Sequence, residues 1–303
     1  MKTHDLMIVG CGPAGCAAAL YAAREELDFV VLSKDLGGYA NYVPDVESYL
    51  GMHYVSGYGL VSAFREHLKD YKVNVCEGCE VRKIEKKKDV FIATTSSGEY
   101  SARTVIVATG RRFRKLGVPG EDAYFEKGIS YCAVCDGPVF RNKTVAVVGG
   151  GRAGLLSTMF LLPIARKIYL LEQGGQLGGT PKMRRAMKDK KVTTLLNTKV
   201  LEIRGDKLAN QLVIETKGKR STLPVGGIFI EIGYEPNTDF LPPEVKLNGR
   251  REIVINKDNE SSLSGLFAAG DVTDVQEKQI LVSAGEGAKS LLSALCYFEE
   301  NCK

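Results

Sequence analysis

The sequence predicts an α/β protein in which two similar domains follow one another and the first is completed only near the C-terminus. Two observations lead to this fold class. A strand, glycine loop and helix pattern occurs twice, around Gly10–Gly15 and, 139 residues later, around Gly149–Gly154. A further strand-like segment, Gly265–Asp271, lies near the end of the 303-residue chain. A chain of this length suits about two domains.

The first repeat is a βαβ unit. The apolar run Leu6–Val9 predicts a buried strand, the Ala-rich stretch Cys16–Arg24 a helix, and Phe29–Leu32 the next strand. Between the first strand and the helix lies the G-x-G-x-x-G loop Gly10–Gly15. Such a loop lets the backbone approach a pyrophosphate, and the N-terminus of the following helix then faces the phosphates.

The second repeat has the same order. Thr144–Val148 predicts a strand, Gly149–Gly154 the loop, Leu155–Ala165 a helix and Ile168–Glu172 the next strand. A single G-x-G-x-x-G is weak support, whereas two in the same context indicate two tandem Rossmann-like dinucleotide-binding domains. The alternative is a pair of glycine turns that bind no ligand.

Two later segments belong with the first repeat. Thr104–Gly110 predicts a buried strand that ends in a tight glycine turn, and Gly265–Asp271 a strand followed by the helix-like run Gln279–Leu295. An acid at that place can bond a ribityl hydroxyl while the helix N-terminus faces a phosphate or a flavin carbonyl. The first domain is therefore expected to be discontinuous. The expected domains are residues 1–115 with 238–303, and the inserted residues 116–237.

Composition excludes several classes of protein. No apolar run approaches the roughly 20 residues of a membrane helix, and Met1–Asp5 leaves no room for a signal peptide, so we expect a cytoplasmic protein. The basic runs Lys86–Lys88 and Arg111–Arg112 are not interleaved with aromatic residues, which disfavours nucleic-acid binding and predicts solvated turns. The net charge of +5 favours an acidic protein partner.

The segment Cys132-Ala-Val-Cys135-Asp136 is the strongest candidate for chemistry. Its C-x-x-C spacing lets two sulfurs close a small disulfide ring at a helix N-terminus, where the dipole lowers a thiol pKa. Asp136 either passes protons to and from the leaving thiolate or caps a helix. A zinc site would need two more ligands, which Cys76 and Cys79 or the histidines would supply. Zinc leaves two dinucleotide folds unexplained.

Six further cysteines lie outside this segment. We interpret the first two as small core residues, the middle two as packed thiols beside a Glu-Gly turn, and the last two as a tail without redox function. They are Cys11, Cys16, Cys76, Cys79, Cys296 and Cys302.

Six motifs, in this order, resemble those of the low-molecular-weight thioredoxin reductases over nearly the whole chain. They are Gly10–Gly15, Gly37–Gly38, Ala108–Gly110, Cys132–Gly137, Gly233–Thr238 and Gly265–Val272. The resemblance implies FAD in the first domain, Cys135 nearest the flavin, Cys132 as the thiol that attacks a thioredoxin disulfide, Asp136 as the acid/base, and a homodimer.

The resemblance also implies which residues contact FAD. They are Gly10, Gly12, Pro13, Ala14, Gly15, Ser33, Lys34, Gly37, Gly38, Tyr39, Ser48, Val81, Ala108, Thr109, Gly110, Gly270, Asp271, Lys278, Gln279 and Ile280.

The second domain departs from the family where a pyridine nucleotide would bind. NADPH-using members carry a His-Arg-Arg-type segment where this chain has Glu172–Gly179. A carboxylate there suits a ribose diol and repels a 2′-phosphate. The helix start Arg152–Leu156 lacks the usual polar groups, and the insert Gly174–Gly179 is expected to fill or reshape the pocket. The candidate contacts for NAD(P)H are Gly149, Gly151, Gly154 and Glu172.

The donor is therefore expected to be NADH or a protein rather than NADPH. Some relatives without these motifs take electrons from reduced ferredoxin and others from a deazaflavin. An acidic ferredoxin suits the net positive charge and is narrowly favoured.

These observations together predict a thioredoxin-disulfide reductase that passes electrons through FAD to Cys132–Cys135 and on to thioredoxin by a mixed disulfide. One alternative is a dithiol oxidase of the same fold that passes electrons to oxygen. Another is a flavin or nucleotide sensor without turnover. Asp136 directly after the pair favours the reductase.

Overall fold

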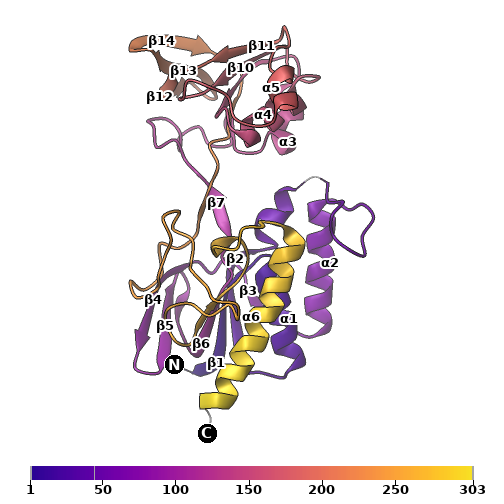
Figure 1. Cartoon of the computed structure of the whole chain (residues 1–303), viewed down its shortest axis with the longest axis vertical. Coiled ribbons are helices and arrows are strands. Elements are labelled where there is room, and N and C mark those ends of the chain that lie inside the picture. Colours follow the sequence, from indigo (N-terminus) through magenta and orange to yellow (C-terminus); the bar gives the residue numbers. More distant parts are fainter. Residues whose placement is uncertain (1, 44, 302–303) are drawn as a thin grey trace. The chain divides into compact units, whose positions relative to one another are not determined.

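The computed structural model describes residues 2–43 and 45–301 and confirms the α/β class. The chain forms two compact units, of which the first combines Met1–Arg112 with Glu235–Lys303 and the second is the continuous stretch Phe113–Tyr234. Figure 1 shows the elements along the chain. The short strands β7 (Arg111–Phe113) and β16 (Tyr234–Pro236) pair where the chain passes from one unit to the other and back.

The first unit is built on one seven-stranded sheet. Its path runs β3-β2-β1-β6-β5-β4, and β17 pairs with β6 beside this path. The strands are β1 (Thr3–Cys11), β2 (Phe29–Leu36), β3 (Val75–Cys76), β4 (Val81–Lys87), β5 (Val90–Thr95), β6 (Gly98–Val107) and β17 (Leu266–Ala268). The β17–β6 pair is parallel and matches Leu266 with Val105, so a segment from near the C-terminus joins a sheet that begins at the N-terminus.

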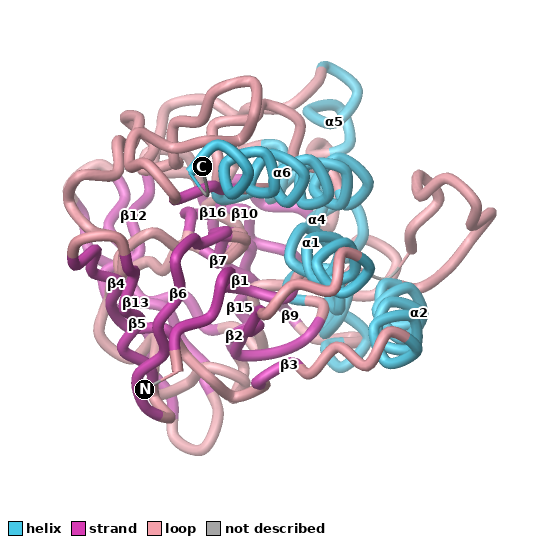
Figure 2. The backbone as a smooth tube through the Cα atoms, turned by 90° about the horizontal axis from the view of Figure 1, so that it is seen from below, coloured by secondary structure: helices cyan, strands magenta, loops and turns pink. Residues whose placement is uncertain are grey.

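Three helices cover one face of this sheet: α1 (Pro13–Arg24), α2 (Gly57–Asp70) and α6 (Ile280–Asn301), as Figure 2 shows. Alternate residues of β1 supply the two cores, because successive strand side chains point to opposite faces. Leu6 and Ile8 pack toward the helices, and Met7 and Val9 toward the other face. Gly287 lets α6 lie against α1, since a Cβ there would come within 2.0 Å of the Ala14 carbonyl oxygen.

The second unit holds a five-stranded parallel sheet and a three-stranded antiparallel meander. The parallel order is β11-β10-β9-β15-β8. These strands are β8 (Ile129–Ser130), β9 (Thr144–Val148), β10 (Lys167–Leu171), β11 (Val192–Leu195) and β15 (Ile228–Ile230). The meander is β12 (Thr198–Gly205), β13 (Ala209–Thr216) and β14 (Lys219–Pro224), and the helices are α3 (Ala133–Asp136), α4 (Arg152–Leu161) and α5 (Pro181–Ala186).

Within residues 2–43 and 45–301, no helix combines the length and the apolar character that crossing a bilayer requires.

Candidate active site

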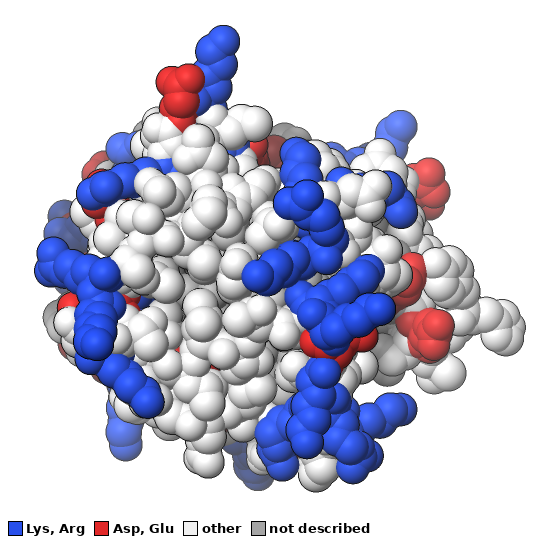
Figure 3. Space-filling model, turned by 90° about the horizontal axis from the view of Figure 1, so that it is seen from above, with Lys and Arg blue, Asp and Glu red and all other residues white. Residues whose placement is uncertain are grey.

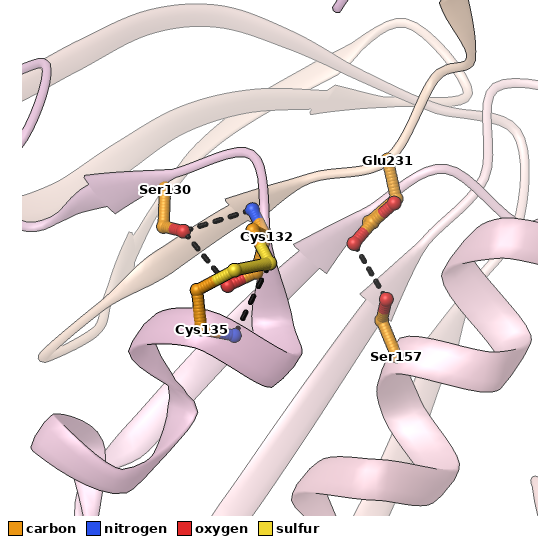
Figure 4. Close-up of a disulfide and its surroundings, with 5 residues drawn as sticks. All are labelled: Ser130, Cys132, Cys135, Ser157 and Glu231. Carbon is orange, nitrogen blue, oxygen red and sulfur yellow. Dashed lines mark hydrogen bonds between the residues drawn. A yellow bond between two sulfur atoms is a disulfide. The ribbon is translucent and has the colours of Figure 1, made fainter. Parts of the chain in front are cut away.

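Cys132 and Cys135 form a disulfide with Cα atoms 5.3 Å apart (Figure 4). Cys132 is the residue before α3, and the Cys135 backbone N–H donates to the Cys132 sulfur at 3.1 Å. The Ser130 hydroxyl fixes the Cys132 backbone, since it accepts from the Cys132 N–H at 2.9 Å and donates to the Cys132 carbonyl at 3.1 Å. Cys132 is half-buried and Cys135 is exposed, so the pair is open to a partner protein.

Asp136 lies on the same helical turn. It is the last residue of α3, its side chain is exposed, and its backbone N–H donates to the Cys132 carbonyl at 3.1 Å. A carboxylate on this turn lies where a proton must come and go when the pair opens and closes.

A second carboxyl near the pair was missed by the sequence reasoning. Glu231 directly follows β15 and accepts a hydrogen bond from the Ser157 hydroxyl of α4 at 2.5 Å, as Figure 4 shows. The Ala133 backbone N–H also bonds to this carboxyl, and burial raises the Glu231 pKa. The signal was a lone acid in the apolar run Ile228–Ile232, since acids seldom lie in buried strands without a partner.

The glycine loop of the first unit serves two purposes. Gly10 and Gly15 are required by packing, since a Cβ would lie 2.5 Å from the Ala108 oxygen in one case and 1.9 Å from the Gly10 oxygen in the other. At Gly12, by contrast, the nearest protein atom to a Cβ is the Gly37 oxygen at 3.8 Å. The protein itself would accept a side chain at Gly12, so the bare backbone there fits the close approach of a pyrophosphate.

Small residues meet at the ends of three strands around this loop. Ala14 after β1, Ala108 after β6 and Ala269 after β17 pack together in a buried cluster. Gly270 lies beside them with φ of +75°, and a Cβ there would be 3.1 Å from the Ala14 Cβ. The structure thus brings together three of the segments predicted to contact FAD: Gly10–Gly15, Ala108–Gly110 and Gly270–Asp271.

Asp271 is held by neighbours from both sides. Its Oδ2 lies 2.7 Å from the Arg111 Nε, and its Oδ1 accepts from the Ser283 hydroxyl at 3.3 Å. Arg112 pairs with Glu235. The prediction of a solvated turn at Arg111–Arg112 is therefore wrong, because both residues lie in β7 and form ion pairs.

The remaining predicted FAD contacts lie on several elements. Lys278 pairs with Glu252 at 3.2 Å, and Gln279 and Ile280 stand at the start of α6. Thr109 donates to the Asn237 carbonyl. Four others lie farther along the chain from the loop glycines, on the β2 end, the helical turn after it, an exposed loop and the start of β4. They are Lys34, Tyr39, Ser48 and Val81.

The second unit repeats the first glycine loop closely. A Cβ at Gly154 would lie 1.7 Å from the Gly149 oxygen, as Gly15 does from Gly10, and Gly151, like Gly12, has open space around it. Gly149 has φ of +121°, and a Cβ there would lie 2.3 Å from the Glu231 oxygen. The two loops therefore share the same division between glycines needed for packing and one that leaves room for a ligand.

The hydrogen bonds of the two loops also correspond. In the first unit the Ser33 hydroxyl accepts from the Cys11 N–H at 3.0 Å, and the Gly37 N–H donates to the Cys11 carbonyl at 2.7 Å. In the second unit the Glu172 carboxylate accepts from the Gly150 N–H at 2.6 Å, and the Gly178 N–H donates to the Gly150 carbonyl at 2.8 Å.

The other Glu172 oxygen accepts from the Gly174 N–H at 2.6 Å. Both carboxylate oxygens thus join the glycine loop to the insert Gly174–Gly179. The insert lies against that loop, since a Cβ at Gly178 would be 3.3 Å from the Gly151 Cα, and its Leu177 packs on the core of the second unit.

The other cysteines have local partners. The Cys11 and Cys16 sulfurs lie 3.5 Å apart in the core, where the contact with Cys16 and burial raise the Cys11 pKa. Cys76 contacts the Tyr100 hydroxyl, and Cys79 contacts the Ser97 hydroxyl at 3.0 Å. Cys296 is exposed. Cys302 lies outside the described residues.

In the part of the chain that the structure describes, no group of three or more His, Cys, Asp or Glu residues is arranged to hold a metal ion.

Comparison with known proteins places residues 4–287 in one family model, described as pyridine nucleotide-disulphide oxidoreductase. Among solved structures, thioredoxin reductase from Lactococcus lactis in the FR conformation is 31% identical, with a TM-score of 0.84 over 98% of this chain and 100% of that one. Ferredoxin-flavin thioredoxin reductase from Clostridium acetobutylicum is 28% identical, with a TM-score of 0.58 over 100% of this chain and 99% of that one.

A curated relative has a different name. Alkyl hydroperoxide reductase F of Staphylococcus epidermidis is 35% identical over 302 residues, which cover 98% of this chain. The chain spans 60% of the length of that relative.

Proposed function

The chain belongs to the pyridine nucleotide-disulphide oxidoreductase family, and from this premise we propose that it is a flavin-dependent reductase of thioredoxin or a thioredoxin-like protein. The predicted resemblance to the low-molecular-weight thioredoxin reductases is confirmed by the comparisons. The observation that carries the proposal is the accessible Cys132–Cys135 disulfide, closed across the start of α3 and held by Ser130.

The family implies FAD, and the residues of the first unit fit it. The open backbone at Gly12 and the N-terminus of α1 suit a pyrophosphate. Gly38 extends this surface, since a Cβ there would lie 3.5 Å from the Gly12 Cα. Bound FAD supplies two-electron redox chemistry. The residues of this chain bind and orient it, with Asp271 held in place by Arg111 and Ser283.

The reduced pair acts by thiol–disulfide exchange. The Cys132 thiolate attacks one sulfur of the partner disulfide, a mixed disulfide forms, and the other partner sulfur leaves as a thiolate that takes up a proton. The Cys135 thiolate then attacks the Cys132 sulfur, which restores the disulfide and releases the partner dithiol. Cys132 is assigned the first attack because the Cys135 N–H points at its sulfur and stabilises a thiolate there. Asp136 exchanges the protons.

The donor that we propose is an acidic protein such as ferredoxin. The second unit carries 20 Lys and Arg residues against 10 Asp and Glu, whereas the first unit carries 21 against 26. Figure 3 shows Lys and Arg side chains in groups on the face that it presents. Exposed Lys182, Arg185, Lys188 and Lys190 lie on and directly after α5. A relative of similar fold is named as ferredoxin-dependent, which supports this choice.

Pyridine nucleotides fit less well. A ribose diol at Glu172 would compete with the Gly150 and Gly174 N–H groups for the same carboxylate oxygens. NADH therefore ranks behind ferredoxin, and NADPH last because of its 2′-phosphate. We also propose a homodimer in a reducing compartment such as the cytoplasm, as the resemblance implies.

The proposal is tested by reducing the purified flavoprotein anaerobically with ferredoxin and following the release of thiols from oxidised thioredoxin. Thiol release that needs both cysteines of the pair is expected. Rapid oxygen consumption with a small dithiol, without thioredoxin reduction, would instead support the dithiol oxidase. Absence of any thiol turnover would support the sensor.

A second candidate partner follows from the similarity to alkyl hydroperoxide reductase F. The Cys132–Cys135 pair would then reduce a peroxide-reducing protein in place of thioredoxin. Parallel assays with oxidised thioredoxin and with an oxidised thiol peroxidase decide between the two, because the preferred partner is the one with the larger kcat/KM.

A further inference from the structure

Glu231 is fixed beside the redox pair by the backbone of the second unit. Its N–H donates to the Val148 carbonyl at 2.7 Å, and its own carbonyl packs against Gly149, where any Cβ would clash. Its carboxyl accepts from the Ser157 hydroxyl of α4 and from the N–H of Ala133, the first residue of α3. The carboxyl therefore ties the start of the redox helix to α4.

No cation compensates this carboxyl among the described residues, since none of their ion pairs includes Glu231. The titratable or charged side chains on the adjoining elements are Cys132, Cys135 and Asp136 around α3 and Arg152 at the start of α4. Two neutral donors alone hold the charge, which is why burial outweighs them and raises the pKa of this acid.

We propose that Glu231 is a positioning residue that makes the Cys132–Cys135 pair a stronger reductant. The inference rests on the proposed function of the pair. Two groups act on the Cys132 thiolate in opposite directions. The Cys135 N–H stabilises it, whereas the Glu231 carboxylate, bound to the amide of the next residue, destabilises it.

A less stable thiolate leaves the reduced form of the pair less stable relative to the disulfide. The reduction potential becomes more negative, which is the reverse of a strong oxidant such as a pair with a very acidic thiol. Electrons then move more readily from the pair to a partner disulfide. This direction suits a reductase and disfavours the oxidase alternative.

The first test measures the thiol directly. In the Cys135→Ser background, with FAD bound, the rate of Cys132 alkylation by iodoacetamide is followed across pH by mass spectrometry of its peptide. Glu231→Gln keeps an oxygen for the Ala133 amide but removes the charge, so the Cys132 pKa should fall. Below that pKa, alkylation rises roughly tenfold for each unit of the fall. An unchanged pH profile would overturn the proposal.

The second test measures the potential of the intact pair by equilibration with glutathione buffers. Glu231→Gln should shift the potential to a less negative value. Ser157→Ala, which removes one donor to the carboxylate, further raises the Glu231 pKa and should shift the potential the same way by a smaller amount. It also serves if Glu231→Gln does not fold.

A purely structural function for Glu231 predicts slower turnover in both variants with no change of thiol pKa or potential, and that result would refute the inference. Both measurements need neither ferredoxin nor thioredoxin. A failure of the proposed partners therefore leaves the inference standing, and the reverse also holds.

Discussion

Ser33 and Glu172 occupy equivalent positions in the two glycine-loop repeats. Strand pairing matches Val9 with Leu32 in one unit and Val148 with Leu171 in the other, so each residue follows its second strand by one step. Each side chain accepts a hydrogen bond from the middle N–H of its glycine loop. The second repeat thus keeps the architecture of the first and exchanges a neutral hydroxyl for a carboxylate.

This exchange predicts that NADPH is a poor reductant of the flavin. A 2′-phosphate about 4 Å from the Glu172 carboxylate loses about 1–4 kcal/mol at effective dielectrics from water to a protein surface. That is roughly a ten- to several-hundredfold loss of affinity. Anaerobic titration with NADPH, NADH and reduced ferredoxin, followed by flavin absorbance, measures it.

Glu172→Ser provides the matched control, since it copies the side chain of the first repeat and should narrow the gap between NADPH and NADH. Rapid bleaching of the unmodified protein by micromolar NADPH would refute the electrostatic argument. Bleaching by NADH alone would refute only the preference for ferredoxin.

FAD binding should depend on the bare backbone at Gly12. Gly12→Ala is expected to fold, because its backbone is extended and open space surrounds it. The helix cap costs about 1 kcal/mol. The flavin content of the purified protein should fall sharply, as read from the ratio of flavin to protein absorbance.

The control for this change is Gly249→Ala, at an exposed position of the first unit that also has open space around it. It should keep its flavin. A protein without a flavin band even after addition of FAD would show that the cofactor assignment is mistaken.

Disulfide reduction should require Cys132 and Cys135 and no other pair. Cys132→Ser and Cys135→Ser should each abolish thioredoxin reduction while FAD stays bound. The double variant Cys76→Ser, Cys79→Ser should remain active, because the two sulfurs contact different partners, Tyr100 and Ser97. A double variant that is folded, yellow and inactive would mean that the wrong pair was chosen.

The basic surface after the second-unit insert should govern the encounter with an acidic donor. Lys182→Glu with Arg185→Glu should raise the KM for ferredoxin several-fold and flatten its dependence on salt, because charge steers encounter more than it holds the complex. Lys217→Glu, in the exposed turn between β13 and β14, tests whether any lost charge has this effect. Equal effects of both changes would argue against a defined docking surface.

Local patterns in the sequence predicted the α/β class, both glycine loops and the C-x-x-C segment, since each depends on neighbours in the chain. The helix predicted over Cys16–Arg24 begins at Pro13, because proline suits a first helical position. The contacts of Glu231 with Ser157 and of Arg111 with Asp271 join residues 74 and 160 positions apart. No periodicity or spacing encodes such pairs, and only the folded sheet brings them together.

The placement of β17 and α6 also has a consequence for the order of folding during synthesis. The second unit is one uninterrupted stretch, so it can fold as soon as Tyr234 has left the ribosome. The first unit begins earlier but must wait, since β17 pairs with β6 and α6 packs on α1 through Gly287. Its apolar β6 edge and α1 surface stay uncovered until the last seventy or so residues emerge. The half-made flavin unit is therefore the stage of biogenesis at which chaperones would be needed most.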